Sequence, residues 1–118
     1  MDNERREYKR VPANLILMYL IQDYEKYKDK NLISIGTPIS VDISTGGMQI
    51  ITCQELPKEA YLKITMAFYT SKEPIEVIGK VMWTKNMTKE RTYKSGVRYE
   101  KFINGRKDLI EEYIKIFD

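Results

Sequence analysis

The sequence predicts a mainly β domain, a small antiparallel barrel or sandwich that ends in one α-helix. Two patterns indicate this class. Five or six short apolar or alternating stretches are separated by turn-forming residues, and after Asn104 the apolar spacing changes from two to three and four. With 118 residues, 42% of them hydrophobic, the chain is long enough for one core and too short for two. We expect one domain over residues 13–118, after a flexible lead-in over residues 1–12.

The first half of the chain is expected to contain three strands. Residues 13–22 form a continuous apolar stretch whose length suits one buried strand better than a helix. Residues 33–43 are rich in isoleucine and interrupted by a glycine and a proline, which favours an extended conformation. Residues 48–52 resume the apolar, β-branched character after a turn. The Gly46–Gly47 pair in that turn predicts a positive φ.

The second half is expected to contain three further strands and the helix. Apolar residues alternate over 62–68 and again over 75–83, where Gly79 interrupts the pattern and indicates a bulge. Trp83 has the inward parity of that strand, so we expect it in the core. Val97 and Tyr99 indicate a last short strand. A helix over about 104–117 is predicted by a stripe at helical spacing, Leu109, Ile110, Tyr113, Ile114 and Phe117.

Composition excludes several classes of function. The chain has no histidine and one cysteine, Cys53, which rules out internal disulfides, Cys/His zinc sites and histidine-based triads. We therefore expect no metal or other cofactor, and no residues are arranged as nucleophile and base, so we expect no enzyme. The charge of +3, from 20 basic and 17 acidic residues, is too balanced for a general nucleic-acid binder.

The location expected from the sequence is the cytoplasm. The apolar run at residues 15–21 is too short to span a bilayer of about 30 Å as a helix, and no signal-peptide cleavage site follows it. The charged segment Tyr24–Asn31 is either a solvated loop or a surface for a partner.

Three arginines precede the first strand: Arg5, Arg6 and Arg10. A guanidinium offers a planar fork of donors that fits phosphate oxygens in two-point contact. In an extended segment Arg6 and Arg10 would point to the same side. The segment is a candidate phosphate site, although a solvated basic end is the simpler explanation of this feature alone.

A second candidate is Asp42-x-Ser44-x-x-Gly47. The Asp42 carboxylate can accept from the ring N–H and the exocyclic amine of guanine, a pair of donors that adenine does not present in the same way. Ser44 could add a hydroxyl contact, and Gly47 could let the backbone approach a ligand. A turn that only stabilises a hairpin explains the same residues and stays open.

Together, Arg-x-x-x-Arg at Arg6 and Arg10 and Asp-x-Ser-x-x-Gly about thirty residues later resemble the PilZ family of cyclic di-GMP receptors. The later segments Gly79–Trp83 and Gly96–Tyr99 add to the resemblance. It implies a six-stranded antiparallel barrel of Greek-key type with a C-terminal helix. It also implies that Arg6 and Arg10 bind phosphates and the guanine Hoogsteen edge, while Asp42 and Ser44 hold a guanine and Gly47 permits the turn.

The resemblance also implies a mode of action. Arg5 resembles the extra arginine of family members that take a stacked pair of ligands. Binding would order the lead-in on the barrel, and the changed surface would act on a partner protein that the sequence does not identify. Two alternatives stay open: a small barrel that binds single-stranded nucleic acid, and a PilZ-like module that binds only proteins.

Overall fold

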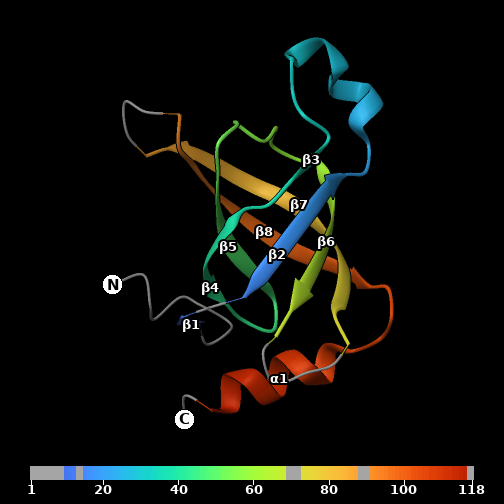
Figure 1. The fold of residues 1–118 in the computed structure, drawn as a ribbon, viewed down its shortest axis with the longest axis vertical. Coiled ribbons are helices and arrows are strands. Elements are labelled where there is room, and N and C mark those ends of the chain that lie inside the picture. The colour runs from blue at the N-terminus through green and yellow to red at the C-terminus, as the bar shows by residue number, and fades with distance from the viewer. Residues whose placement is uncertain (1–9, 13–14, 69–72, 88–90, 117–118) are drawn as a thin grey trace.

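The computed structural model describes residues 10–12, 15–68, 73–87 and 91–116, and all statements below concern that part of the chain. It contains one curled antiparallel sheet with an α-helix at one end (Figure 1). In chain order the elements are β1 (Val11–Pro12), β2 (Ile16–Ile21), the 3-10 helix η2 (Tyr24–Lys30), β3 (Ile35–Gly36), β4 (Ile39–Ile43), β5 (Gly47–Thr52), β6 (Tyr61–Ala67), β7 (Ile75–Asn86), β8 (Tyr93–Phe102) and α1 (Lys107–Lys115). The predicted mainly β class with a C-terminal helix is confirmed.

The sheet is an open half-barrel of eight described strands, so the expected closed barrel of six strands is wrong. The strand order is β1-β4-β5-β8-β7-β6-β2-β3. Closure would require β2 to pair with β4, and these two strands do come close to each other. However, β3 pairs with the outer edge of β2, and β1 pairs with the outer edge of β4. Because both edges are occupied, the ladder does not close.

The two additional strands, β1 and β3, are short. The sequence pattern assigned the residues of β1 to the lead-in and those of β3 to a longer strand. Val11–Pro12, the end of the expected lead-in, pairs with β4 as β1. The expected strand over 33–43 is divided into β3 and β4 around Pro38, because proline has no N–H to donate to a ladder. The charged segment after β2 forms η2, at the opposite end of the sheet from α1 (Figure 1).

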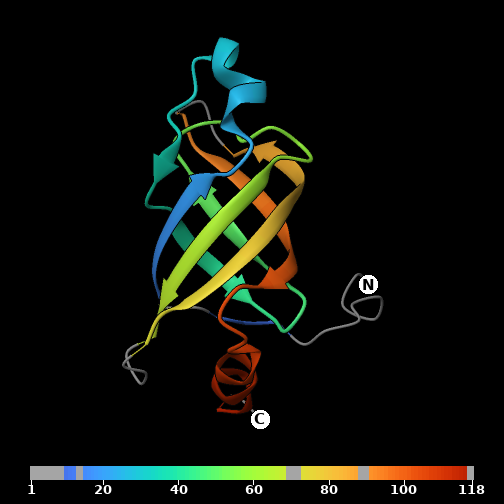
Figure 2. The same ribbon diagram turned by 90° about the vertical axis from the view of Figure 1, so that its right-hand side faces the viewer.

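The core fills the concave side of the sheet. Alternate residues of β6, namely Leu62, Ile64 and Met66, are fully buried, as the period-two pattern predicted. The helix α1 lies across one end of the sheet, seen nearly end-on in Figure 2, and buries Ile110 and Ile114. It begins at Lys107, later than the expected 104, because Gly105 has a left-handed φ of 68° that interrupts the helix.

Strand β7 contains two irregularities, and the second corrects a prediction. The register shifts between Ile78 and Gly79, which confirms the bulge inferred from the glycine. It shifts again between Val81 and Trp83. Because one extra residue reverses the side-chain parity, Trp83 points outward and is 39% exposed. The expectation that Trp83 lies in the core is therefore wrong.

Candidate functional site

The turn between β4 and β5 is built around the Ser44 hydroxyl. Its Oγ accepts the backbone N–H groups of Gly46 and Gly47, both at 3.1 Å, and donates to the Gly47 carbonyl at 3.2 Å. A hydroxyl has one proton to donate and two lone pairs, so these contacts use all of its capacity. Ser44 is 1% exposed. In this conformation it stabilises the turn and has no bond left for a ligand.

Gly47 is required for a reason other than the one the sequence predicted. Gly105 is the only described glycine with a positive φ, so the positive φ predicted for the Gly46–Gly47 pair is wrong. A Cβ on Gly47 would instead lie 2.2 Å from the Val97 carbonyl oxygen. The close approach of β5 to β8 therefore excludes any side chain at this position.

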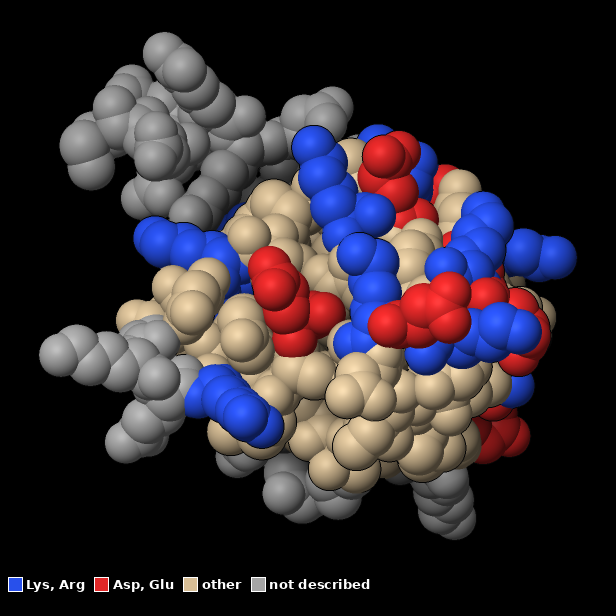
Figure 3. Space-filling view, turned by 90° about the horizontal axis from the view of Figure 1, so that it is seen from above, with Lys and Arg blue, Asp and Glu red and all other residues tan. Residues whose placement is uncertain are grey.

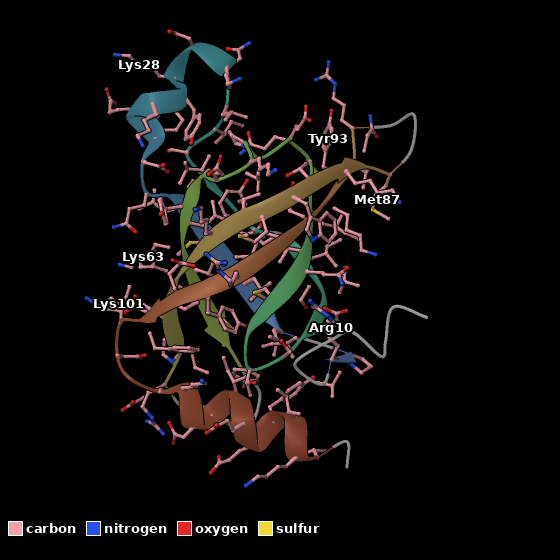
Figure 4. The ribbon with its side chains drawn as sticks, turned by 180° about the vertical axis from the view of Figure 1, so that it is seen from behind. Arg10, Lys28, Lys63, Met87, Tyr93 and Lys101 are labelled. Carbon is pink, nitrogen blue, oxygen red and sulfur yellow. The ribbon has the colours of Figure 1, made fainter. Side chains whose placement is uncertain are left out.

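Arg10 and Asp42 are brought together by β1. Pro12 pairs with Asp42 in the sheet, and the Arg10 guanidinium Nη1 lies 3.1 Å from the Asp42 Oδ1. Both side chains are partly buried, with 29% and 19% of their surfaces exposed. The helix α1 holds this segment in position, since the Tyr113 hydroxyl donates to the Pro12 carbonyl at 2.9 Å. Figure 4 shows Arg10 beside the lower end of β5.

A hollow of about 180 Å³ lies between these groups. Its lining is contributed by the segment before β1, the turn, β7 and β8: Arg10, Ser44, Gly46, Gly47, Met82, Trp83, Gly96, Val97 and Arg98. Trp83 lies over Gly96, where a Cβ would meet its Nε1 at 2.1 Å. The missing side chain at Gly96 thus lets the indole pack closely against β8. The hollow is small, so a ligand of dinucleotide size would lie across its mouth.

A larger hollow, about 990 Å³, lies at the η2 end of the sheet, and Trp83 lines both. Its charged lining residues are Lys30, Glu55, Lys58 and Arg91. Figure 3 shows that lysines, arginines and carboxylates are interspersed on this face. Such mixing lacks the continuous basic groove that single-stranded nucleic acid requires. We therefore centre the candidate site on the smaller hollow, where the sequence motifs converge.

The structure brings together the four described residues that the sequence selected for the site. Arg10, Ser44 and Gly47 line one hollow, and Asp42 pairs with Arg10 at its edge. Arg5 and Arg6 lie outside the described residues. The described chain shows no group of three or more His, Cys, Asp or Glu side chains suited to a metal ion. It also contains no helix that is long and apolar enough to cross a membrane.

Lining residues that the sequence did not assign to the site include Gly96, Arg98 and Trp83. Gly96 and Arg98 lie in the expected last strand, where the alternation with Val97 indicates that both face outward. For Trp83 the signal was misleading, because nothing in the sequence marks the second register shift of β7.

Together, a curled antiparallel sheet and an arginine–aspartate pair beside a serine-built turn define a small β module with a surface site. The PilZ domain family model matches residues 4–115, so the chain belongs to the PilZ domain family. No curated protein matches the chain in sequence.

Solved structures with the same fold include three bacterial proteins. The Bacillus subtilis inhibitor of motility MotI/DgrA has a TM-score of 0.70 at 18% identity, covering 92% of this chain and 49% of that one. Escherichia coli YcgR, solved with c-di-GMP, has 0.70 at 16%, covering 96% and 46%. The K. pneumonia MrkH–c-di-GMP complex has 0.66 at 15%, covering 93% and 51%. The chain thus spans about half the length of these proteins.

Proposed function

We propose that this chain is a receptor for cyclic di-GMP, bound at the hollow between Arg10 and the turn after Asp42. The observation that carries the proposal is the 3.1 Å contact between these residues, which lie 32 positions apart in the sequence. Arg10 offers only donors and the Asp42 carboxylate only acceptors. A ligand that separates them must supply acceptors to one and donors to the other. Membership of the PilZ family and the c-di-GMP present in the YcgR and MrkH structures support the same ligand.

Cyclic di-GMP meets both requirements. Its phosphate oxygens, and N7 and O6 of guanine, accept from a guanidinium fork. The guanine ring N–H and exocyclic amine donate to a carboxylate, a pair that adenine lacks. In our proposal Arg10 and Arg6 bind the phosphates and the Hoogsteen edge, and Asp42 binds the Watson–Crick edge.

The remaining site residues have supporting roles in this proposal. Ser44 and Gly47 keep the turn closed, because the hydroxyl of Ser44 is already saturated by the turn. Trp83 offers an exposed indole on which a base stacks. Arg5 contributes to a second, stacked ligand molecule. The chain then acts as a binding module and not as an enzyme.

Isothermal titration calorimetry tests the assignment. Arg6→Ala, Arg10→Ala and Asp42→Ala should each weaken binding of cyclic di-GMP by at least about 1.5 kcal/mol, since hydrogen bonds to charged groups contribute about that much. Arg106→Ala is the matched control, because Arg106 pairs with Asp108 and Glu73 at the start of α1. Cyclic di-AMP should bind far more weakly. Wild-type affinity in all three site variants would refute the site.

The signalling step is proposed to be ligand-induced ordering of the N-terminal segment that precedes β1, which changes the surface offered to a partner protein. Amide hydrogen exchange over these residues should slow when cyclic di-GMP binds. Unchanged exchange despite measured binding would remove this step. A single-stranded oligonucleotide that displaced the ligand, with a steep salt dependence, would favour the nucleic-acid alternative instead.

A further inference from the structure

Among the described residues, the smaller hollow is lined by two charged side chains, and both are arginines. Arg10 comes from the segment before β1, and Arg98 comes from β8. Their carboxylate partners, Asp42 and Glu100, are not part of the lining. The described wall of the hollow therefore presents two guanidinium groups and no carboxylate, which favours an anionic ligand. Arg10 already belongs to the proposed site, whereas Arg98 lies outside both sequence motifs.

Arg98 lies beside the motif glycine on the outer face of the sheet. It pairs with Gly47 in the register of β5 and β8, and a Cβ on Gly47 would meet the Arg98 Cα at 3.2 Å. Its neighbour Val97 is buried in the core, so the alternation of the strand places the Arg98 side chain outward. Strand β5 lies between β4 and β8. The bare backbone at Gly47 thus separates Arg98 from Arg10, which pairs with a residue of β4.

The Arg98 guanidinium keeps donors available for a ligand. Its Nε donates to the Glu100 Oε2 at 2.8 Å. The described residues supply no partner for its two terminal amino groups, and 53% of the side chain is exposed. Glu100 therefore holds the Nε side of the guanidinium and leaves the terminal amino groups accessible. These groups form the planar fork that fits two oxygens of a phosphate.

We propose that Arg98 binds the second phosphate of cyclic di-GMP through this fork. The inference rests on the proposed function and extends it. Cyclic di-GMP is a ring that contains two phosphates. A ring that lies over Gly47 offers one phosphate to the arginines on the β4 side and the other to Arg98 on β8. The site then contacts both phosphates of one ligand molecule, with a separate guanidinium for each.

Lys80 provides a matched control on the same face of the sheet. It pairs with Arg98 from β7, so the two cations are direct neighbours across the strands. The Lys80 Nζ, however, lies 3.8 Å from the Glu59 Oε1 and 5.8 Å from the centre of the Tyr61 ring, on the side of β6. It does not line the hollow. Removal of either cation changes the net charge equally, so a difference between them separates direct contact from the general field of the protein.

Isothermal titration calorimetry with cyclic di-GMP tests the inference. Arg98→Ala should raise the Kd about tenfold, as expected for one hydrogen-bonded charged contact at an exposed position. Arg98→Lys keeps the charge but loses the fork, and should raise the Kd about threefold. Lys80→Ala should change the Kd by less than about twofold. Arg98→Ala should unfold at nearly the wild-type temperature, because an exposed ion pair contributes little to stability.

A double variant tests whether the two arginines bind different phosphates. Arg10→Ala and Arg98→Ala together should multiply their separate effects on the Kd. A double variant that binds as well as Arg10→Ala alone would contradict separate phosphates. Wild-type affinity of Arg98→Ala, or an equal loss in Lys80→Ala, would overturn the inference, and weakened binding by Arg10→Ala would then leave the proposed function intact. Failure of the wild-type chain to bind cyclic di-GMP would overturn both.

Discussion

Replacement of Ser44 by alanine should destabilise the empty protein, because this hydroxyl closes the turn on which the site rests. The variant loses two accepted hydrogen bonds of 3.1 Å and one donated bond of 3.2 Å. The Gly47 carbonyl keeps the Ser44 backbone N–H at 2.8 Å, and the partly buried Gly46 N–H can bond to water. The Gly47 N–H is buried and loses its acceptor in the turn. One unsatisfied buried donor costs about 1–3 kcal/mol, and we expect a loss of about 2 kcal/mol.

Urea unfolding followed by circular dichroism measures this loss directly. In a domain of this size, 2 kcal/mol lowers the Tm by about 8 °C. Ser34→Ala, a half-buried serine outside the turn, is the control and should change stability by less than about 0.5 kcal/mol. An unfolding free energy of Ser44→Ala equal to that of the wild type would refute the argument. It would mean that Ser44 is kept for the ligand and not for the turn.

Three further changes test the same structure. Gly96→Ala places a methyl group on the Trp83 indole, so the indole should swing outward; the fluorescence emission of Trp83, the single tryptophan, should shift to the red and cyclic di-GMP should bind several-fold more weakly. Tyr113→Phe removes the 2.9 Å bond to the Pro12 carbonyl and should speed amide exchange at Val11 while costing about 1 kcal/mol in stability. In alkali, Tyr99→Phe should lose less stability than the wild type. The folded pKa of Tyr99 is raised above its ordinary value of 10.0 because burial disfavours the ionised form, so above pH 10 Tyr99 ionises in the unfolded state first and the wild type loses up to about 1.4 kcal/mol of stability per pH unit relative to Tyr99→Phe. Parallel unfolding curves of the two proteins between pH 8 and pH 11 would contradict this.

Local patterns predicted the strands because their causes are local. The alternation of Leu62, Ile64 and Met66 reflects one buried face of a strand. Pro38 limits strand pairing because proline has no N–H to donate, whatever its surroundings. The open half-barrel was not predictable in this way. It depends on Val11–Pro12 occupying the edge of β4, a pairing between segments about thirty residues apart that no periodicity encodes.

The same distinction holds for the candidate site, where the sequence indicates the chemistry of single residues but not their contacts. The residue types at Arg10 and Asp42 indicated their chemistry, and the structure added that they pair with each other. The alternation of the sequence predicted that Trp83 faces inward, and a register shift after Val81 makes this prediction wrong. Bulges arise from the balance of two whole strands, so a single-strand pattern cannot locate them unless a glycine marks the place, as Gly79 does.

The internal contacts of the empty site bear directly on its affinity. The Ser44 hydroxyl is saturated by the turn, Arg10 is paired with Asp42, and the Trp83 indole lies against Gly96. The binding free energy therefore reflects only the difference between the contacts that the ligand makes and those that it breaks. It is reduced further by the loss of translational and rotational freedom on association. That difference suits micromolar binding, about 8 kcal/mol, which lets a signal dissociate when its concentration falls.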